Sequence, residues 1–253
     1  MKFFLTSMFG RETSRGDRRF GLDRIVFLLS LFILIVTVLM PMLMIVVRTF
    51  FKGTQPDWAL FTRVVMAPEN LSAIYNTVKI GFFVTLFGTV LGLFYAWLIG
   101  RSDIPMKGLM KALFTIPYMF PPFFGAMAWS LLLAPRSGYM NKWFMQLTGG
   151  TAPLLDINSI GGIVFVETCY YFPFVFLQVV SALERMDPTL EESARIAGAG
   201  QWYVIRKITL PLVLPAIAAG AMLILISSLS HFGVPAILGF SNNIFTLPTK
   251  IFQ

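Results

Sequence analysis

The chain has 253 residues, of which 57% are hydrophobic and only 13% are charged. Soluble domains carry charge on about a quarter or more of their surface residues, so this composition excludes a soluble globular protein and indicates a membrane protein. The formal net charge is +8, and the single cysteine and single histidine exclude a disulfide framework, a thiolate metal cage and a multi-histidine metal site.

The chain begins with a basic arm over residues 1–24, which is followed by an uncharged run from Ile25 to Val47. As a helix, this run would be about 35 Å long, enough to cross a hydrocarbon core of roughly 30 Å. It is too long for the apolar part of a signal peptide, so we expect a retained first span. We assign the span and the outer loop after it to residues 25–69.

Four further apolar runs predict four more membrane helices. They cover residues 73–99, 109–133, 160–183 and 211–230. Together with the first span they predict an all-α, multi-pass bundle of about five helices in a lipid bilayer. Most lysines and arginines lie in the first arm and in the loops after the second and fourth spans, so the positive-inside rule places the amino terminus and these loops in the cytoplasm. This use of the basic residues argues against binding to nucleic acid.

The second span carries two glycines, Gly88 and Gly92, four positions apart and therefore on one face of a helix. In lipid, small residues at this spacing let helices approach closely, because van der Waals contact replaces the hydrophobic effect. Ala216 and Gly220 repeat the spacing in the fifth span. We expect packing positions here rather than residues that line a pore.

Three prolines interrupt the third span, at Pro117, Pro121 and Pro122. Each removes a backbone donor, so the carbonyls that it frees must be satisfied by protein or water rather than by lipid. A simple kink accounts for this pattern, and so does a translocation path lined by the freed carbonyls. The sequence leaves both interpretations open.

Glu167 lies about seven residues into the fourth span, and Tyr170 follows it by one turn. A carboxylate inside a membrane is costly and is by default a functional candidate, so we consider both residues for the translocation path. The alternative is that Glu167 lies near the outer interface and is paired with a base or a tyrosine hydroxyl. Lys79 in the second span is equally ambiguous, since its long side chain can reach the interface.

The polar segment 184–211 between the fourth and fifth spans is the one densely charged surface of this apolar chain. Asp187 is placed to cap a short helix, and Glu191 and Glu192 then lie near the positive end of the helix dipole. Gly198 can end that helix and lets another backbone approach closely.

After Gly198 we expect a second short helix over residues 201–209, before Pro211 opens the fifth span. This hairpin resembles the signature cytoplasmic loop of the membrane subunits of binding-protein-dependent ABC importers. The family pattern is Glu-Ala-Ala, three residues, Gly, nine residues, Ile, one residue and Leu-Pro. The matching residues are Glu192, Ser193, Ala194, Gly198, Ile208, Leu210 and Pro211, with serine at 193 as the one departure.

The resemblance implies that residues 187–209 dock as a coupling helix on a dimer of cytoplasmic ATP-binding subunits. It assigns charged contacts to Glu192 and close approach to Ala194 and Gly198, with Asp187 and Glu191 in the same loop. It also implies an inner membrane location, an extracytoplasmic substrate-binding protein and a second permease half, fused or separate. The chain has no Walker-type phosphate loop, so we expect no enzymatic activity and no bound cofactor, with ATP used by the partner.

The resemblance covers most of residues 70–253, which we take as the permease domain. Further motifs are most similar to permeases for ferric iron, and they are Leu133-Ala134-Pro135-Arg136, Gly138, Asn141, Phe232-Gly233-Val234-Pro235-Ala236 and Thr249-Lys250-Ile251. They imply iron as substrate, although permeases for polyamines, thiamine or aminoethylphosphonate share the layout. Members of the iron group are usually two fused halves, so we expect a first half truncated at its carboxyl end.

Two other classes of function remain open at this point. A secondary transporter or channel would use Glu167 and Lys79 as an intramembrane ion site, and a membrane-embedded scaffold would transport nothing. Neither class needs a charged hairpin between the fourth and fifth spans, which favours the ATP-driven importer.

Overall fold

The computed structural model describes residues 19–52, 55–56 and 58–253. Most of the basic arm predicted over residues 1–24 therefore lies outside the described residues. Two compact units make up the chain, with the boundary between Val65 and Met66. They are described separately below.

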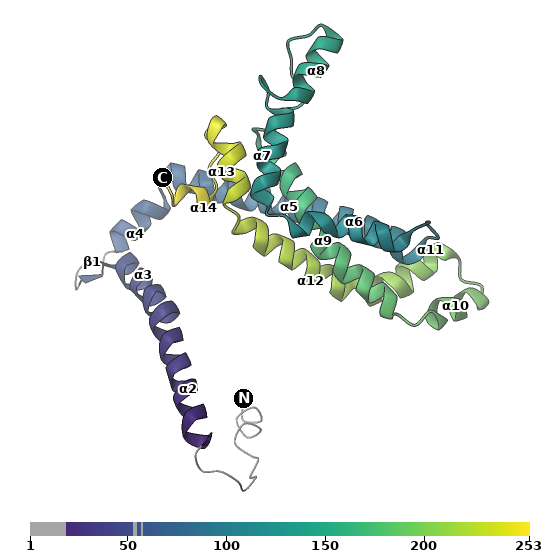
Figure 1. Ribbon diagram of the computed structural model, residues 1–253, viewed down its shortest axis with the longest axis horizontal. Helices are drawn as coiled ribbons and strands as arrows, with labels where there is room; N and C mark the ends of the chain where they lie inside the picture. Colours follow the sequence, from purple (N-terminus) through teal and green to yellow (C-terminus); the bar gives the residue numbers. More distant parts are fainter. Residues whose placement is uncertain (1–18, 53–54, 57) are drawn as a thin grey trace. The chain divides into compact units, whose positions relative to one another are not determined.

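The first unit is built on one long apolar helix (Figure 1). Three segments follow one another without a break, namely α2 (Arg19–Leu34), the π-helical turn η1 (Ile35–Leu39) and α3 (Met40–Phe50). All side chains of residues 23–49 are exposed. An apolar helix with no buried face needs lipid or another protein around it, so the span predicted over residues 25–47 is supported.

A short hairpin follows this helix. The strands β1 (Phe51–Lys52) and β2 (Gln55–Pro56) pair antiparallel over two residues each, a small exception to the predicted all-helical fold. Helix α4 (Trp58–Val65) then packs against the end of α3. The ring centroid of Phe50 lies 5.1 Å from that of Trp58 and 5.0 Å from that of Phe61, which holds α4 in place.

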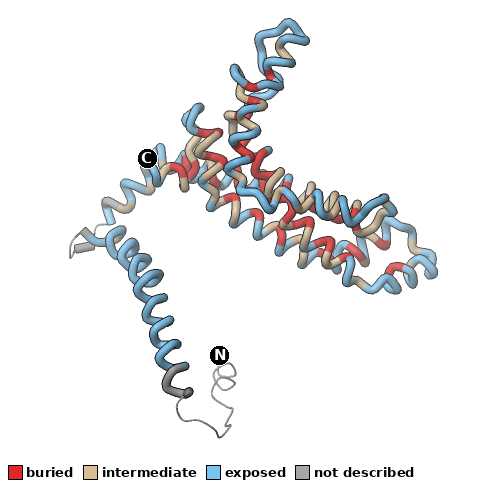
Figure 2. The backbone as a smooth tube through the Cα atoms, viewed as in Figure 1, coloured by how far each residue is buried: buried red, intermediate tan, exposed pale blue. Residues whose placement is uncertain are grey.

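The second unit is organised around α9 (Ile160–Arg185), with α5 (Pro68–Arg101) and α12 (Leu210–Leu229) packed along it. Within the most apolar stretch of each helix, 67% of the residues are buried in α9, but only 28% in α5 and 22% in the helix containing α12. Figure 2 shows this difference as the concentration of buried positions along α9. The fourth predicted span is therefore the central helix of the bundle.

Small residues bring these helices together. A Cβ atom at Gly92 would lie 2.7 Å from the carbonyl oxygen of Phe172, and one at Gly220 would lie 2.6 Å from the Cα of Val175. Both distances are shorter than van der Waals contact, so only glycine allows α5 and α12 to lie this close to α9. Gly88 is also buried. The prediction of packing positions in the second and fifth spans is confirmed.

The third predicted span, 109–133, is not one kinked helix. Its two helices, α6 (Lys107–Met119) and α7 (Pro122–Leu133), meet at an angle of 94°. Phe120 and Pro121 between them are extended, because Pro121 and Pro122 cannot donate the hydrogen bonds that would continue α6. Helix α6 lies along α9, whereas α7 contacts α13 (Gly233–Gly239) and is followed by α8 (Tyr139–Thr148). Among the described residues four helices are long and apolar enough to cross a membrane, or five if α6 and α7 form one span.

Between the fourth and fifth spans, α10 (Thr189–Ile196) is followed by a helix that runs unbroken from Gln201 to Leu229. It comprises α11 (Gln201–Val204), the π-helical turn η2 (Ile205–Thr209) and α12. Residues 201–209 are helical as predicted, but they are continuous with the fifth span instead of forming a separate short helix. The N–H of Leu210 bonds to the carbonyl of Ile205, one residue farther back than in an α-helix, and this wider turn accommodates Pro211.

The chain then passes through α13, η3 (Phe240–Asn242) and α14 (Leu247–Lys250) at the opposite end of the bundle from α10 (Figure 1). This last segment is tied to α5. Leu247 N donates to Thr77 Oγ1 at 2.7 Å, and Asn76 Nδ2 donates to the carbonyl of Phe245 at 3.1 Å. The Asn-Thr pair in the second span thus holds the segment before α14.

Candidate functional site

The polar hairpin of α10 and α11 lies at one end of the bundle, where α5 ends and α6 begins (Figure 1). Helix α10 begins at Thr189, with Pro188 in the capping position, so the cap is one residue later than predicted. Asp187 still contributes, because its Oδ1 accepts a hydrogen bond from Thr189 N at 2.9 Å. This backbone N–H holds the pKa of the Asp187 carboxyl below its usual value.

Gly198 ends the first half of the hairpin as predicted. Helix α10 stops at Ile196, and Gly198 has a φ of +87°, a left-handed conformation that side chains other than glycine rarely adopt. Ala199 N donates to the carbonyl of Ala194 at 2.9 Å and closes the turn. A Cβ atom at Gly198 would have no neighbour within 4 Å, so this turn faces open space.

The outer surface of the hairpin carries large apolar side chains that nothing in the described chain covers. The exposed fractions are 48% for Leu190, 87% for Ile196, 72% for Trp202 and 58% for Tyr203. Exposed acids and bases lie among them in the sequence, namely Glu192, Arg195, Arg206 and Lys207. Large exposed apolar side chains interspersed with charged ones are typical of a protein interaction surface.

The two neighbouring acids of α10 differ in position, which the sequence did not reveal. Glu192 is exposed, whereas Glu191 is only 8% exposed and points into the fold. Glu191 Oε1 accepts hydrogen bonds from Arg101 Nε at 3.1 Å and from Thr209 Oγ1 at 2.7 Å. Glu191, which was predicted to belong to the same loop, thus makes its contacts inside the chain.

The remaining residues of the predicted loop motif are spread over both sides of the hairpin. Ser193 is exposed on α10, and Ala194 is half-buried. Ile208 is half-buried, while Leu210 and Pro211 are exposed at the start of α12.

A second cluster surrounds Glu167, which is fully buried. Ser228 Oγ donates a hydrogen bond of 2.5 Å to Glu167 Oε2, and His231 Nδ1 lies 3.0 Å from Oε1. The interpretation that Glu167 is paired is therefore correct, and the base is the only histidine of the chain. The sequence did not single out either partner; Ser228 lies in the last turn of α12, and His231 lies just beyond its end.

The predicted path residues fall in one region of the bundle. Tyr170 lies across Gly125 of α7, where a Cβ atom would be 2.2 Å from its hydroxyl oxygen. Pro121 and Pro122 form the bend before this part of α7, and Pro117 lies within α6. The first turn of α7 thus meets α9 at Tyr170, one turn after Glu167.

Lys79, the second charged residue considered for the translocation path, does not contact Glu167. Lys79 is half-buried, and its Nζ lies 5.8 Å from the ring centre of Tyr75 on the same helix. None of the contacts found among the described residues joins Lys79 to Glu167. The part of the chain that the structure describes also contains no group of three or more His, Cys, Asp or Glu side chains that could hold a metal ion.

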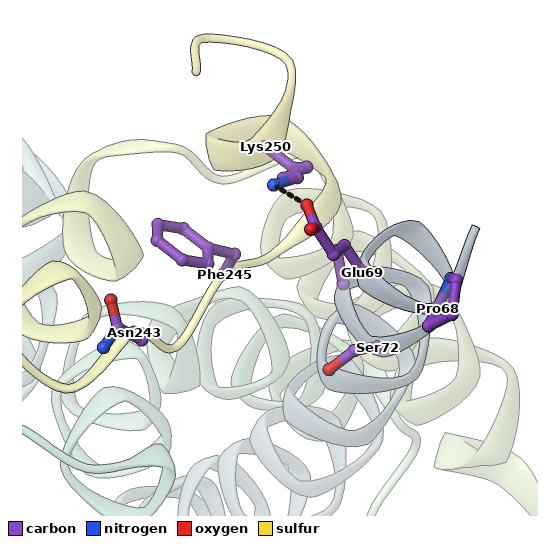
Figure 3. Close-up of a pocket in the computed structure, with 7 residues that line it drawn as sticks. Pro68, Glu69, Ser72, Asn243, Phe245 and Lys250 are labelled. Atoms are coloured by element: carbon purple, nitrogen blue, oxygen red, sulfur yellow. Dashed lines mark hydrogen bonds and ion pairs between the residues drawn. The ribbon is translucent and has the colours of Figure 1, made fainter. Parts of the chain in front are cut away.

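An open pocket of about 540 Å³ lies at the end of the bundle opposite the hairpin (Figure 3). It is formed by the first turns of α5 and the segment before and within α14. Lys250 Nζ and Glu69 Oε2, 2.8 Å apart, make an ion pair at this pocket. The other lining residues are Pro68, Ser72, Ala73, Asn243 and Phe245.

The contacts of Glu167 predict how strongly substitutions at this position lower the stability of the folded protein. Glu167→Ala leaves Ser228 and His231 without their buried acceptor and is expected to lower stability by roughly 1–3 kcal/mol, whereas Glu167→Gln keeps an acceptor and costs less. The control is Glu184→Ala, which breaks an exposed ion pair of 2.8 Å with Lys111 and should change stability by about 1 kcal/mol or less. Thermal unfolding in nanodiscs measures the difference, and equal shifts for Glu167→Ala and Glu184→Ala would contradict it.

Comparison with known proteins adds a family match. Residues 88–252 match the family described as "Binding-protein-dependent transport system inner membrane component". The matched region contains α9, the hairpin and the cluster around Glu167.

Individual relatives extend this similarity. The chain is 32% identical to the molybdenum transport system permease protein ModB of Escherichia coli K12, over 72% of the chain and 76% of the relative. It is 26% identical to the sulfate transport system permease protein CysW of Synechocystis, over 87% of the chain and 76% of the relative. A bacterial alginate ABC transporter, solved with a periplasmic protein bound to an alginate pentasaccharide, shares the fold, with a TM-score of 0.68 and 21% identity over 88% of this chain and 77% of that one.

Proposed function

The chain belongs to the family of inner membrane components of binding-protein-dependent transport systems, and is thus a membrane-spanning permease subunit of an ABC importer; from this premise we propose that its hairpin, residues 187–209, docks on a cytoplasmic ATPase dimer. The observation that carries the proposal is the exposure of four large apolar side chains of the hairpin, Leu190, Ile196, Trp202 and Tyr203, with exposed charged residues between them in the sequence. An amphipathic helical surface of this kind fits a groove on a partner.

Charge and shape give the hairpin residues separate tasks in this proposal. Glu192 makes charged contacts with the partner, and the neighbouring Ser193 is also exposed on α10. Gly198 leaves space for the partner backbone, since no described residue lies within 4 Å of a Cβ atom at this position. Closure of the ATPase dimer around ATP then displaces the hairpin and shifts the bundle between inward-open and outward-open states.

The opposite end of the bundle receives the substrate in this proposal. An extracytoplasmic binding protein docks near the pocket of Glu69 and Lys250, and the substrate passes the α6–α7 bend close to Glu167 and Tyr170. A second permease half, fused or separate, forms the other wall of the path. The chain lies in the inner membrane with its hairpin in the cytoplasm.

We propose a small inorganic ion as the substrate class. The sequence motifs resemble those of ferric iron permeases, but iron occurs in none of the relatives' names given above, and two of these are named for molybdenum and sulfate transport. The described residues offer no cluster of hard oxygen ligands in the membrane, so selectivity for ferric iron would have to reside in the binding protein. Uptake of labelled iron, sulfate and molybdate by cells that express the complete transporter distinguishes these substrates.

Co-purification with the ATPase tests the docking surface. Trp202→Asp places a charge at an exposed apolar position of the hairpin and is expected to abolish co-purification, because a desolvated charge without a partner weakens an interface strongly. The control is Trp143→Asp on α8, where the tryptophan is exposed to a similar extent, 64% against 72%. Retention of the ATPase by the Trp202→Asp variant would refute the docking surface.

Transport measurements decide against the other classes of function. A secondary transporter that uses Glu167 predicts uptake that follows an ion gradient and survives inactivation of the ATPase. A scaffold predicts no uptake at all. The proposal requires uptake that stops when ATP hydrolysis stops.

A further inference from the structure

Glu191 is the one acid of the hairpin whose carboxylate is buried. It projects from α10 into the space between the carboxyl end of α5, where Arg101 is the last helical residue, and the start of the fifth span, where Thr209 closes η2. Oε1 accepts from both, at 3.1 Å from Arg101 Nε and 2.7 Å from Thr209 Oγ1. One oxygen atom therefore connects α10 to Arg101, which lies 90 residues earlier in the sequence, and to Thr209, which lies 18 residues later.

The surroundings enclose this contact. The free space beside it is about 30 Å³, room for only one or two water molecules. The space is lined by residues of α5, α10 and the helix that begins at Gln201, among them Trp97 and Val204. Arg101 is further held by Met186, whose sulfur lies 3.9 Å from Nη2. Limited solvent access strengthens an ion pair, because water competes less for both groups.

The chain enters and leaves α10 through short non-helical segments. On one side Met186 is extended before Pro188, and on the other side the turn passes through Gly198 and Gly200. Neither segment continues α10 as a helix into α9 or α11. A buried side-chain contact therefore adds a direct mechanical connection from α10 to α5 and to the start of α12.

We propose that Glu191 is a positioning residue that, with Arg101 and Thr209, clamps the hairpin to α5 and to the start of α12. The clamp rests on the proposed function for the origin of the force, since the ATPase is what moves the hairpin. The clamp itself transmits the movement of α10 to the membrane helices. Displacement of α10 moves the ends of two membrane helices with it because the buried carboxylate cannot leave its partners without an uncompensated charge.

Distance measurements test the clamp without any partner. Spin labels are attached through Asp103→Cys after α5 and Ala197→Cys after α10, both exposed, in a Cys169→Ala background of the full chain in nanodiscs. The distance distribution is expected to be narrow in the parent and broad after Glu191→Gln or Arg101→Gln, each of which leaves one partner without its opposite charge. The double variant with both glutamines has no buried charge and is expected to be narrow again.

Transport per ATP hydrolysed supplies the functional readout in the complete importer. Each single glutamine variant is expected to lower this ratio about tenfold or more, while the ATPase still co-purifies, and the double variant is expected to recover most of it. Glu184→Gln, which removes the exposed pair with Lys111, serves as the control and should leave both readouts unchanged.

The outcomes separate the clamp from the docking surface. An unchanged distance distribution in both single variants overturns the clamp, and so does a double variant that remains as broad as the singles. Broadening in the single variants with recovery in the double variant supports the clamp. The same pattern in a chain that binds no ATPase supports the clamp and overturns the proposed function.

Discussion

Replacing Gly92 with leucine is expected to prevent the α5–α9–α12 bundle from folding. Even the first carbon of a side chain there would lie 2.7 Å from the carbonyl oxygen of Phe172, 2.9 Å from Val175 Cβ and 3.0 Å from Phe176 N. Two of these three atoms belong to the backbone of the central helix, which cannot rotate out of the way. Overpacking typically costs about 1–3 kcal/mol for extra methylene groups alone, and a displaced helix axis costs more.

Alanine separates the clash from the other effects of replacing glycine. In an open helical position Gly→Ala raises helix stability by about 1 kcal/mol, and Gly108 in α6 is such a position, with no atom within 4 Å of the added carbon. Gly92→Ala is thus expected to lower the midpoint of thermal unfolding and Gly108→Ala to raise it slightly. Folded yield from membranes and thermal unfolding in nanodiscs measure both. Equal behaviour of the two alanine variants would contradict the close approach of α5 and α9.

Replacing Gly198 with tryptophan is expected to abolish coupled transport and leave the bundle folded. The local cost is small, since the first carbon of the added side chain meets no described residue within 4 Å and the left-handed backbone costs a non-glycine residue only about 1–2 kcal/mol. The indole instead occupies the surface where the ATPase is proposed to dock. We expect wild-type amounts of folded protein, lost ATPase co-purification and substrate uptake at background.

Two control variants distinguish the effect of side-chain size at position 198 from the effect of backbone strain. Gly198→Asn keeps a residue that tolerates the left-handed conformation and should retain most transport. Gly149→Trp introduces the same side chain at another left-handed glycine, with φ of +65° and no neighbour within 4 Å, after α8. Normal uptake with Gly198→Trp would show that the turn does not face a partner.

The hairpin shows which structural features a local sequence pattern can predict and which it cannot. The spacing around Glu192 and Gly198 gave the position of the turn and the end of α10, because capping and glycine conformations depend on a few consecutive residues. The same pattern placed Glu191 and Glu192 together, although one is buried and the other exposed. Two adjacent helical positions point about 100° apart, and only the location of Arg101 and Thr209 decides which of them faces inward.

The prediction of iron as substrate is not supported by the comparisons, and the structure indicates why its motifs are weak evidence. Thr249-Lys250-Ile251 makes contacts at the end of the bundle opposite the hairpin, where Lys250 pairs with Glu69 and Thr249 takes part in the cap of α14. Residues with such structural contacts do not by themselves identify an ion. The comparisons accordingly support the importer family and not iron.

By itself, the sequence determined that this protein is a membrane bundle, where its long helices run and where its polar hairpin turns, because the length of an apolar run and the caps of a helix are local properties. The tertiary structure alone decided that α9 is central, that α6 and α7 meet at 94°, and that Glu167 pairs with His231, 64 residues away. These features depend on which helix faces come together. In lipid that choice is made by close packing at residues such as Gly92 and by the need of each buried charge for a partner, and both depend on the whole bundle.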